Sequence, residues 1–261
     1  MATADVLQAL TVNPALAHSR VFEDGPDAVR KEGEVVRLRR EVEAMEFVAS
    51  RTSIPIPQII EACLDADADP EEPLGPDGWI RMKRMPGQSL GDAWPTMTEA
   101  ARERTESQLK SYIQQLRQLP SPHPGSICSC SGGPAYDHRI TNMKTCGPFA
   151  TIGEFHDSLV APIKKSPRPD WVAKYRKLLP DTYSVVFAHA DLSWENILVD
   201  AESGDITAVL DWEMAGFWPE WWEYRKALYG SRAREWWRDV LSKVMDEYIT
   251  ETEADMDLEM F

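Results

Sequence analysis

The chain has 261 residues, a formal net charge of -15 and 43% hydrophobic residues, and this length allows one large domain or two lobes of roughly 100 to 150 residues each. The acidic balance argues against a nucleic-acid partner, because phosphate backbones are held mainly by clustered Lys and Arg. No run approaches the length of a membrane span, and the N-terminus has neither a basic leader nor a long apolar core. We therefore expect a cytoplasmic protein with no membrane partner.

The first third of the chain predicts a small sheet with one helix. Residues 20 to 33 predict two short strands around a turn at Asp24, and residues 35 to 50 repeat apolar side chains at helical spacing. An extended stretch and a strand are expected next, then an exposed acidic loop at residues 65 to 78. Residues 79 to 85 alternate apolar and basic side chains, which indicates a strand.

The rest of the chain predicts mainly helices. A long helix covers residues 98 to 119, and residues 120 to 148 form a loop that is long enough to be functional or mobile. The acids after residue 245 predict a solvated helix end and a frayed tail. Further helices are expected at residues 149 to 160, 170 to 179, 219 to 230 and 232 to 250.

Four cysteines are too few and too unevenly spaced for a disulfide scaffold, so reduced thiols are expected. The C-x-C spacing of Cys128 and Cys130 does not match structural zinc pairs.

The order of these elements predicts an α+β fold of two unequal lobes. Strands with one helix come first, and helices around one small hairpin follow, whereas an alternating parallel sheet would need repeated strand-helix units. We place a β-rich nucleotide-binding lobe at residues 1–85 and a larger, mostly helical catalytic lobe at residues 86–261.

Residues 189 to 211, "HADLSWENILVDAESGDITAVLD", concentrate polar side chains at the mouth of an apolar hairpin. With the turn centred on Ser203 and Gly204, paired residue numbers sum to 407, so Asn196 lies opposite Asp211. Side chains paired in this way lie about 5 Å apart at Cβ and can share a metal ion. An amide and a carboxylate at one hairpin mouth thus predict a Mg²⁺ site.

Asp191 lies on the loop that leads into the same hairpin. A loop carboxylate near metal ions can accept the proton of an attacking hydroxyl group. Each polar residue also has a structural alternative, because Asp and Asn commonly cap turns and helices. The joint pattern H-x-D-x4-N, strand, turn, strand and D favours phosphoryl transfer.

This segment resembles the catalytic segment of the aminoglycoside phosphotransferase and choline kinase-like family, distant relatives of protein kinases, and is most similar to its fungal branch of small-molecule phosphotransferases. The resemblance extends from about residue 21 to about residue 247. It implies a protein-kinase-like two-lobed fold with ATP in the cleft. By this likeness Asp191 is the catalytic base, His189 braces the loop, and Asn196 and Asp211 bind Mg²⁺.

The resemblance also implies a nucleotide site. Lys31, in "AVRKEG", is similar to the family's phosphate-binding lysine, and Glu41 to the acid that holds it, with Glu43 as a competitor. A charged surface strand and an exposed helix acid are the structural alternative. If residues 79 to 87 connect the lobes, the backbone of Lys83 and Met85 would meet adenine.

Two departures from the family pattern bear on function. Ala190 stands where relatives often have Gly, which restricts φ, and no G-x-G-x-x-G loop is present to cover phosphates. Impaired ATP binding would make the chain a non-catalytic, kinase-like binding or scaffold protein, which is the alternative function.

The expected acceptor is a hydroxyl group on a small molecule bound among the C-terminal helices. Tryptophans with Glu220 and Glu223 nearby would suit a cationic amine, although Trp more often packs between helices. The residues concerned are Trp218, Trp221, Trp222, Trp236 and Trp237.

Overall fold

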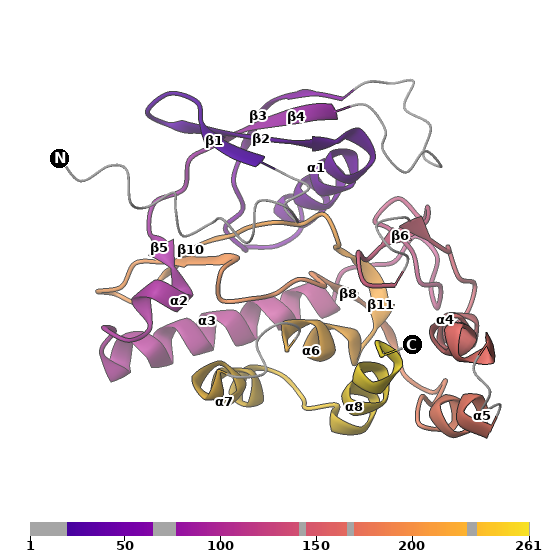
Figure 1. The fold of residues 1–261 in the computed structure, drawn as a ribbon. Coiled ribbons are helices and arrows are strands. Elements are labelled where there is room, and N and C mark those ends of the chain that lie inside the picture. Colours follow the sequence, from indigo (N-terminus) through magenta and orange to yellow (C-terminus); the bar gives the residue numbers. More distant parts are fainter. Residues whose placement is uncertain (1–19, 65–76, 141–144, 166–169, 229–233, 261) are drawn as a thin grey trace.

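The computed structural model describes residues 20–64, 77–140, 145–165, 170–228 and 234–260; nearly all of the expected acidic loop at 65 to 78 lies outside them. In these ranges, no helix combines the length and the apolar character that a membrane crossing requires. A small sheet with one helix lies above a larger, mostly helical part (Figure 1). This division matches the two lobes that the element order predicted.

The upper part is a four-stranded antiparallel sheet with the strand order β1-β2-β4-β3. Each strand lies where the sequence predicted one, and the helix α1 (Val35–Ala49) follows β2 without a loop. Because the chain turns directly from strand to helix, α1 packs against the sheet through Leu38, Met45 and Ile80. The strands are β1 (Arg20–Glu23), β2 (Ala28–Glu34), β3 (Ile59–Cys63) and β4 (Asp77–Lys83).

The lower part is organised around α3 (Glu99–Arg117), the predicted long helix. Thr98 caps its first turn by accepting the N–H of Ala101 at 3.2 Å. Above the helix lies a three-stranded sheet with the order β10-β9-β5 (Figure 1). It joins β5 (Gln88–Ser89), expected only as a turn before α2 (Leu90–Ala93), to the predicted hairpin β9 (Ile197–Val199) and β10 (Ile206–Val209).

The long loop after α3 is tied into the fold by short strand pairs. β6 (Ala135–Tyr136) pairs with β7 (Thr145–Cys146), and Cys128 bridges to Phe217 of β11 (Gly216–Pro219). β11 in turn pairs with β8 (Val185–Ala188), directly before His189. The loop is therefore connected through β11 to β8, the strand that leads to residues 189 to 211. The four cysteines are free thiols, as expected.

The helices that follow differ from prediction mainly near the C-terminus. α4 (Ile152–Val160) and α5 (Asp170–Lys177) lie where expected, with a 3-10 turn (Ala161–Lys165) after α4. The helix expected at 219 to 230 is shorter, because β11 extends to Pro219. The helix expected at 232 to 250 ends at Val244, and a separate helix begins at Ile249. These are α6 (Trp222–Ala227), α7 (Glu235–Val244) and α8 (Ile249–Leu258).

The expected frayed C-terminal tail is wrong. Asp255 on α8 has no exposed surface, and Glu251 is also buried. Asp255 pairs with Arg225 and Arg139 at 2.7 and 2.8 Å. Buried arginines from distant segments neutralise these acids, which sequence composition alone does not reveal.

Four of the five tryptophans that could have received a cation pack in the core. Trp218, Trp221, Trp222 and Trp237 are fully buried, and Trp218 and Trp222 stack at 5.4 Å. The packing role that tryptophan more often has is therefore confirmed for these four residues, while Trp236 is partly buried and stacks with Trp94 at 5.0 Å.

Candidate active site

His189 connects the loop that carries Asp191 to the segment after β10. Its ring is fully buried, Nε2 lies 2.9 Å from the carbonyl oxygen of Leu210, and Nδ1 lies 3.2 Å from the backbone N–H of Asp191. This pattern requires a neutral ring in which Nε2–H donates and Nδ1 accepts. Burial lowers the pKa of His189 to about 4, which is consistent with the neutral form. The ring thereby joins the Asp191 loop to the strand that precedes Asp211.

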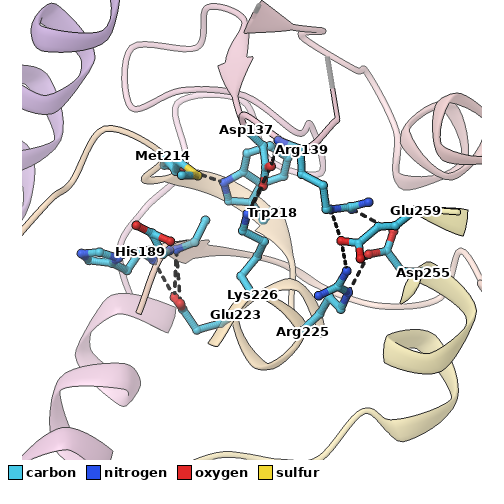
Figure 2. A network of polar contacts seen from close by, with 12 residues as sticks. Asp137, Arg139, His189, Met214, Trp218, Glu223, Arg225, Lys226, Asp255 and Glu259 are labelled. Atoms are coloured by element: carbon cyan, nitrogen blue, oxygen red, sulfur yellow. Dashed lines mark hydrogen bonds and ion pairs between the residues drawn. The ribbon is translucent and has the colours of Figure 1, made fainter. Parts of the chain in front are cut away.

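Glu223 on α6 fixes the same loop from the other side. Its carboxylate accepts the backbone N–H groups of His189 at 2.6 Å and Ala190 at 3.2 Å (Figure 2). Burial raises the pKa of Glu223 to about 7. Ala190 has a φ of 60°, a left-handed conformation that glycine adopts more easily. Glu223 is thus a support for the loop, not part of an acceptor pocket.

Asn196 and Asp191 are brought together by a direct hydrogen bond. The Asn196 amide donates to the Asp191 carbonyl at 2.9 Å and to its carboxylate Oδ2 at 3.1 Å. Burial, together with the charge of Asp211, raises the pKa of Asp191 well above its usual range. The five-residue spacing in sequence therefore closes into one polar group at the hairpin mouth.

The predicted register of the hairpin is wrong by one residue. Ala208 pairs with Leu198 and Val209 with Ile197, and the N–H of Leu210 donates to the carbonyl of Asn196 at 2.8 Å. Paired numbers thus sum to 406 near the mouth, because the turn begins earlier and a bulge in β10 inserts one residue.

Asp211 still lies at the site, because its backbone conformation differs from that of the strand before it. Its φ of 64° places it in the left-handed region, where the chain leaves the strand direction. Its carboxylate Oδ1 lies 2.9 Å from Nζ of Lys31.

Lys31 lies among three carboxylates. Its Nζ is 2.7 Å from Glu41 on α1, 2.9 Å from Asp211 and 3.8 Å from Glu213. Burial opposes the charge, but the carboxylates outweigh burial and raise the pKa of Lys31 above its usual range. The buried pair of Lys31 and Glu41 excludes the surface alternative, and Glu43 instead accepts from Ser131 at 3.1 Å.

Sequence reasoning missed two charged residues beside this cluster. Arg37 on α1 donates to Glu213 at 2.5 Å, and both side chains are buried. Two features of the sequence indicated that these residues lie near the site. Glu213 follows Asp211 by two residues, and Arg37 precedes Glu41 by four residues on the same helix face.

The three carboxylates around Lys31 are groups that a divalent cation also binds, but the ammonium of Lys31 already lies among them, 2.7 Å from Glu41 and 2.9 Å from Asp211. Oxygens of Glu41, Asp211 and Glu213 lie within 4.8 Å of one another, and carboxylate oxygens are the ligands that Mg²⁺ prefers. Only Asp211 of these three has an appreciably exposed side chain, at 35%, against 2% for Glu41 and 6% for Glu213. An ion arriving from solvent would therefore meet Asp211 first.

The segment after β4 has few backbone donors left for a ligand. The N–H of Lys83 donates to Gln58 at 2.8 Å, that of Arg84 donates to Asp27 at 2.8 Å, and Pro86 has none. Within residues 83 to 86, Met85 is the residue whose N–H has no hydrogen-bond partner in the described part of the chain. A base bound here would receive a donor from Met85 rather than from Lys83.

A second buried network lies beside the catalytic loop and was not predicted (Figure 2). Lys226 on α6 pairs with Asp137 of the long loop at 3.0 Å, and both are buried. Arg139, two residues later, pairs with Asp255 of α8. No sequence signal links these segments, because the residues lie more than 80 positions apart.

The small antiparallel sheet over a helical lobe, with charged groups from both at their boundary, is the kinase-like fold of aminoglycoside phosphotransferases. A sequence profile described as the phosphotransferase enzyme family matches residues 28–257, and the chain belongs to that family. Comparison of the sequence with curated proteins finds no match.

Solved structures support the fold at low sequence identity. The GDP complex of aminoglycoside 2'-phosphotransferase-IIIa has a TM-score of 0.63 and 13% identity, covering 93% of this chain and 80% of that one. The GDP and kanamycin complex of APH(2")-IIia has a TM-score of 0.61 and 14% identity over 97% and 86%. Aminoglycoside-3'-phosphotransferase of type VIII has a TM-score of 0.54 and 16% identity over 98% of both chains.

Proposed function

We propose that this family member transfers the γ-phosphate of ATP, with Mg²⁺, to a hydroxyl group of a small molecule. One observation carries the proposal: Lys31 donates to Asp211, 180 residues away in the chain, at 2.9 Å, and Asn196 donates to Asp191 at 3.1 Å. The two pairs are adjacent, because the N–H of Leu210, next to Asp211, donates to the carbonyl of Asn196 at 2.8 Å. Residues 1–85 would form the nucleotide lobe and residues 86–261 the catalytic lobe. The fungal branch and the cytoplasmic location expected from the sequence stay predictions.

Each residue has a distinct role in the proposed reaction. Asp191 accepts the proton of the acceptor hydroxyl, and the raised pKa of its carboxyl group favours taking up that proton. His189 and Glu223 hold the loop so that this carboxylate stays in place.

The nucleotide would be held by the other lobe. Lys31, kept charged by the carboxylates around it, binds the α- and β-phosphates while Glu41 orients it. Adenine would lie against the backbone of Lys83 and Met85, with the N–H of Met85 as the donor. Asn196 and Asp211 would hold Mg²⁺, which when bound neutralises phosphate charge.

The acceptor class is the open part of the proposal. Titles of the solved relatives name kanamycin and hygromycin B as bound molecules, and the net charge of -15 would attract such cations. Four of the five tryptophans expected to receive a cation are buried, and Trp236 is partly buried, so other residues would have to form most of its pocket.

The test is ATP consumption by purified protein with Mg²⁺ and pooled hydroxylated metabolites, cationic and neutral pools being assayed separately. The Asp191→Asn variant is the control, and we expect it to bind ATP but to lose activity by roughly 10²- to 10⁴-fold. Equal turnover by both proteins would rule out Asp191 as the base.

A non-catalytic binding protein on the same frame is the second candidate. The turn between β1 and β2 has a single glycine, Gly25, and is tied down by Arg81, which donates to Asp24 at 2.9 Å. A phosphate cover built from this turn would lack flexible glycines. This candidate predicts a thermal shift with small molecules or a partner protein and none with Mg²⁺-ATP.

A further inference from the structure

Five ionisable side chains meet where α1 and β2 approach the segment after β10. Two are cations, Lys31 and Arg37, and three are carboxylates, Glu41, Asp211 and Glu213. All except Asp211 have exposed fractions of 7% or less. Because carboxylates outnumber cations in a buried place, the choice of partner for each one decides what Lys31 can do.

Glu213 divides its two oxygens between the two cations. Oε1 lies 2.5 Å from Nη2 of Arg37, whereas Oε2 lies 3.8 Å from Nζ of Lys31. Glu41 and Asp211 already contact Lys31 at 2.7 and 2.9 Å. Glu213 is therefore a third carboxylate within ion-pair distance of Lys31, turned toward Arg37.

Arg37 is positioned so that its guanidinium group binds Glu213. Its guanidinium lies 5.3 Å from the ring centroid of Tyr136. Its Nε and Nη1 have no hydrogen-bond partner among the described residues, so Glu213 receives its strongest contact. Arg37 and Glu41 are four residues apart on α1 and share a face.

We infer that Arg37 is a positioning residue for Lys31: by binding Glu213, it keeps a competing carboxylate away from the ammonium that binds nucleotide phosphates. This inference rests on the proposed function of Lys31. Without Arg37, the charge of Glu213 would be buried with Lys31 as its remaining cation. Lys31 would then contact three carboxylates and have no donor left for a phosphate, since an ammonium group has three.

The test measures ATP affinity calorimetrically in EDTA, which isolates phosphate binding by Lys31 from metal binding. Arg37→Met should weaken ATP binding roughly 10- to 100-fold, the size of a lost charge-assisted contact. The double variant Arg37→Met/Glu213→Gln should return to within about threefold of wild type, because the competing charge is gone. Arg37→Lys should be closer to wild type than Arg37→Met.

Arg104→Met is the matched control. Arg104 also pairs with a carboxylate, Asp205, at 2.7 Å, but it is more than half exposed at the turn end of the hairpin. Its loss should leave ATP affinity unchanged.

Two results would overturn the inference: wild-type affinity in Arg37→Met, or a double variant as weak as Arg37→Met. If wild-type protein binds no ATP, the proposed function is wrong. The interaction of Arg37 with Glu213 is then tested by the midpoint of urea unfolding, measured without nucleotide. Arg37→Met should then unfold at lower urea concentration than wild type, and adding Glu213→Gln should restore part of the loss. Equal midpoints for the single and double variants would contradict it.

Discussion

Lys31 and Asp211, 180 residues apart in the chain, are joined by a hydrogen bond of 2.9 Å between Nζ and Oδ1. The bond connects the sheet of the upper lobe to the segment that leaves the hairpin of the lower lobe. Because Lys31 also contacts Glu41, one ammonium group ties a strand, a helix and the candidate metal ligand together.

Lys31→Met should destabilise the protein strongly. The change leaves buried carboxylates without their central cation, and breaking a buried ion pair typically costs about 3–5 kcal/mol. Urea unfolding monitored by tryptophan fluorescence measures the free energy of unfolding. Lys243→Met removes an exposed lysine that pairs with Glu106 at 2.7 Å and should change it by less than about 1 kcal/mol. Similar losses in the two variants would contradict the central role of Lys31.

Glu223 should make stability depend on pH. Burial raises the pKa of Glu223 from 4.5 to about 7, so the folded protein holds this proton more tightly than the unfolded chain. The resulting stabilisation is fully present below the unfolded pKa and is lost as pH rises through the folded pKa. Its size is on the order of 3 kcal/mol.

The Glu223→Gln variant checks this sign. Gln cannot titrate but keeps an oxygen for the N–H of His189. Between about pH 5 and pH 8, the melting temperature of wild type should fall relative to that of Glu223→Gln. Glu195→Gln, at an exposed position of the same loop, should run parallel to wild type. A constant difference between wild type and Glu223→Gln would show that Glu223 does not titrate in this range.

Asp255→Ala should destabilise the protein although Asp255 lies six residues before the last residue of the sequence. Its carboxylate is fully buried against Arg225 and Arg139, and removing it leaves the two guanidinium groups with Glu259 as their remaining shared carboxylate. Loss of a partner from a buried ion pair typically costs about 3–5 kcal/mol, and the contacts with Glu259 place Asp255→Ala at the lower end of that range. Glu253→Ala, two residues earlier and exposed, is the control and should be nearly neutral. Thermal unfolding of both variants makes the comparison, and a neutral Asp255→Ala would restore the frayed-tail prediction.

Gly204→Ala should cost more than Gly125→Ala. Both glycines have positive φ, 77° and 85°, so alanine at either position loses about 1–2 kcal/mol through backbone conformation. A Cβ on Gly204 would also clash with the carbonyl oxygen of Ala101 on α3, whereas one on Gly125 meets nothing within 4 Å. Chemical denaturation should therefore separate the variants by roughly 1–3 kcal/mol. Equal losses would mean that the turn moves away from α3.

Residue patterns within single segments correctly predicted the elements of the first sheet and two helices. The strands of the first sheet, α1 and α3 follow from residue alternation and helical spacing within each segment. The C-terminal helices were less well predicted. Pro219 ends strand β11 where a helix was expected, and one helix ends at Val244 before the next begins at Ile249. No pattern close to Pro219 in the sequence indicates that β11 pairs with β8, which lies about 30 residues earlier.

The sequence by itself determined the chemical inventory of the site and its family: the spacing of Asp191 and Asn196, the strand pair that follows, and a lysine and an acid on an early strand and helix. Only the tertiary structure decided which charges meet. The bond of Arg37 to Glu213, the bonds of Glu223 to the loop at His189 and the burial of Asp255 against Arg225 and Arg139 join segments far apart in the chain. Ion pairing in a buried place depends on distances of a few ångströms and on exclusion of water, and packing of the whole chain sets both.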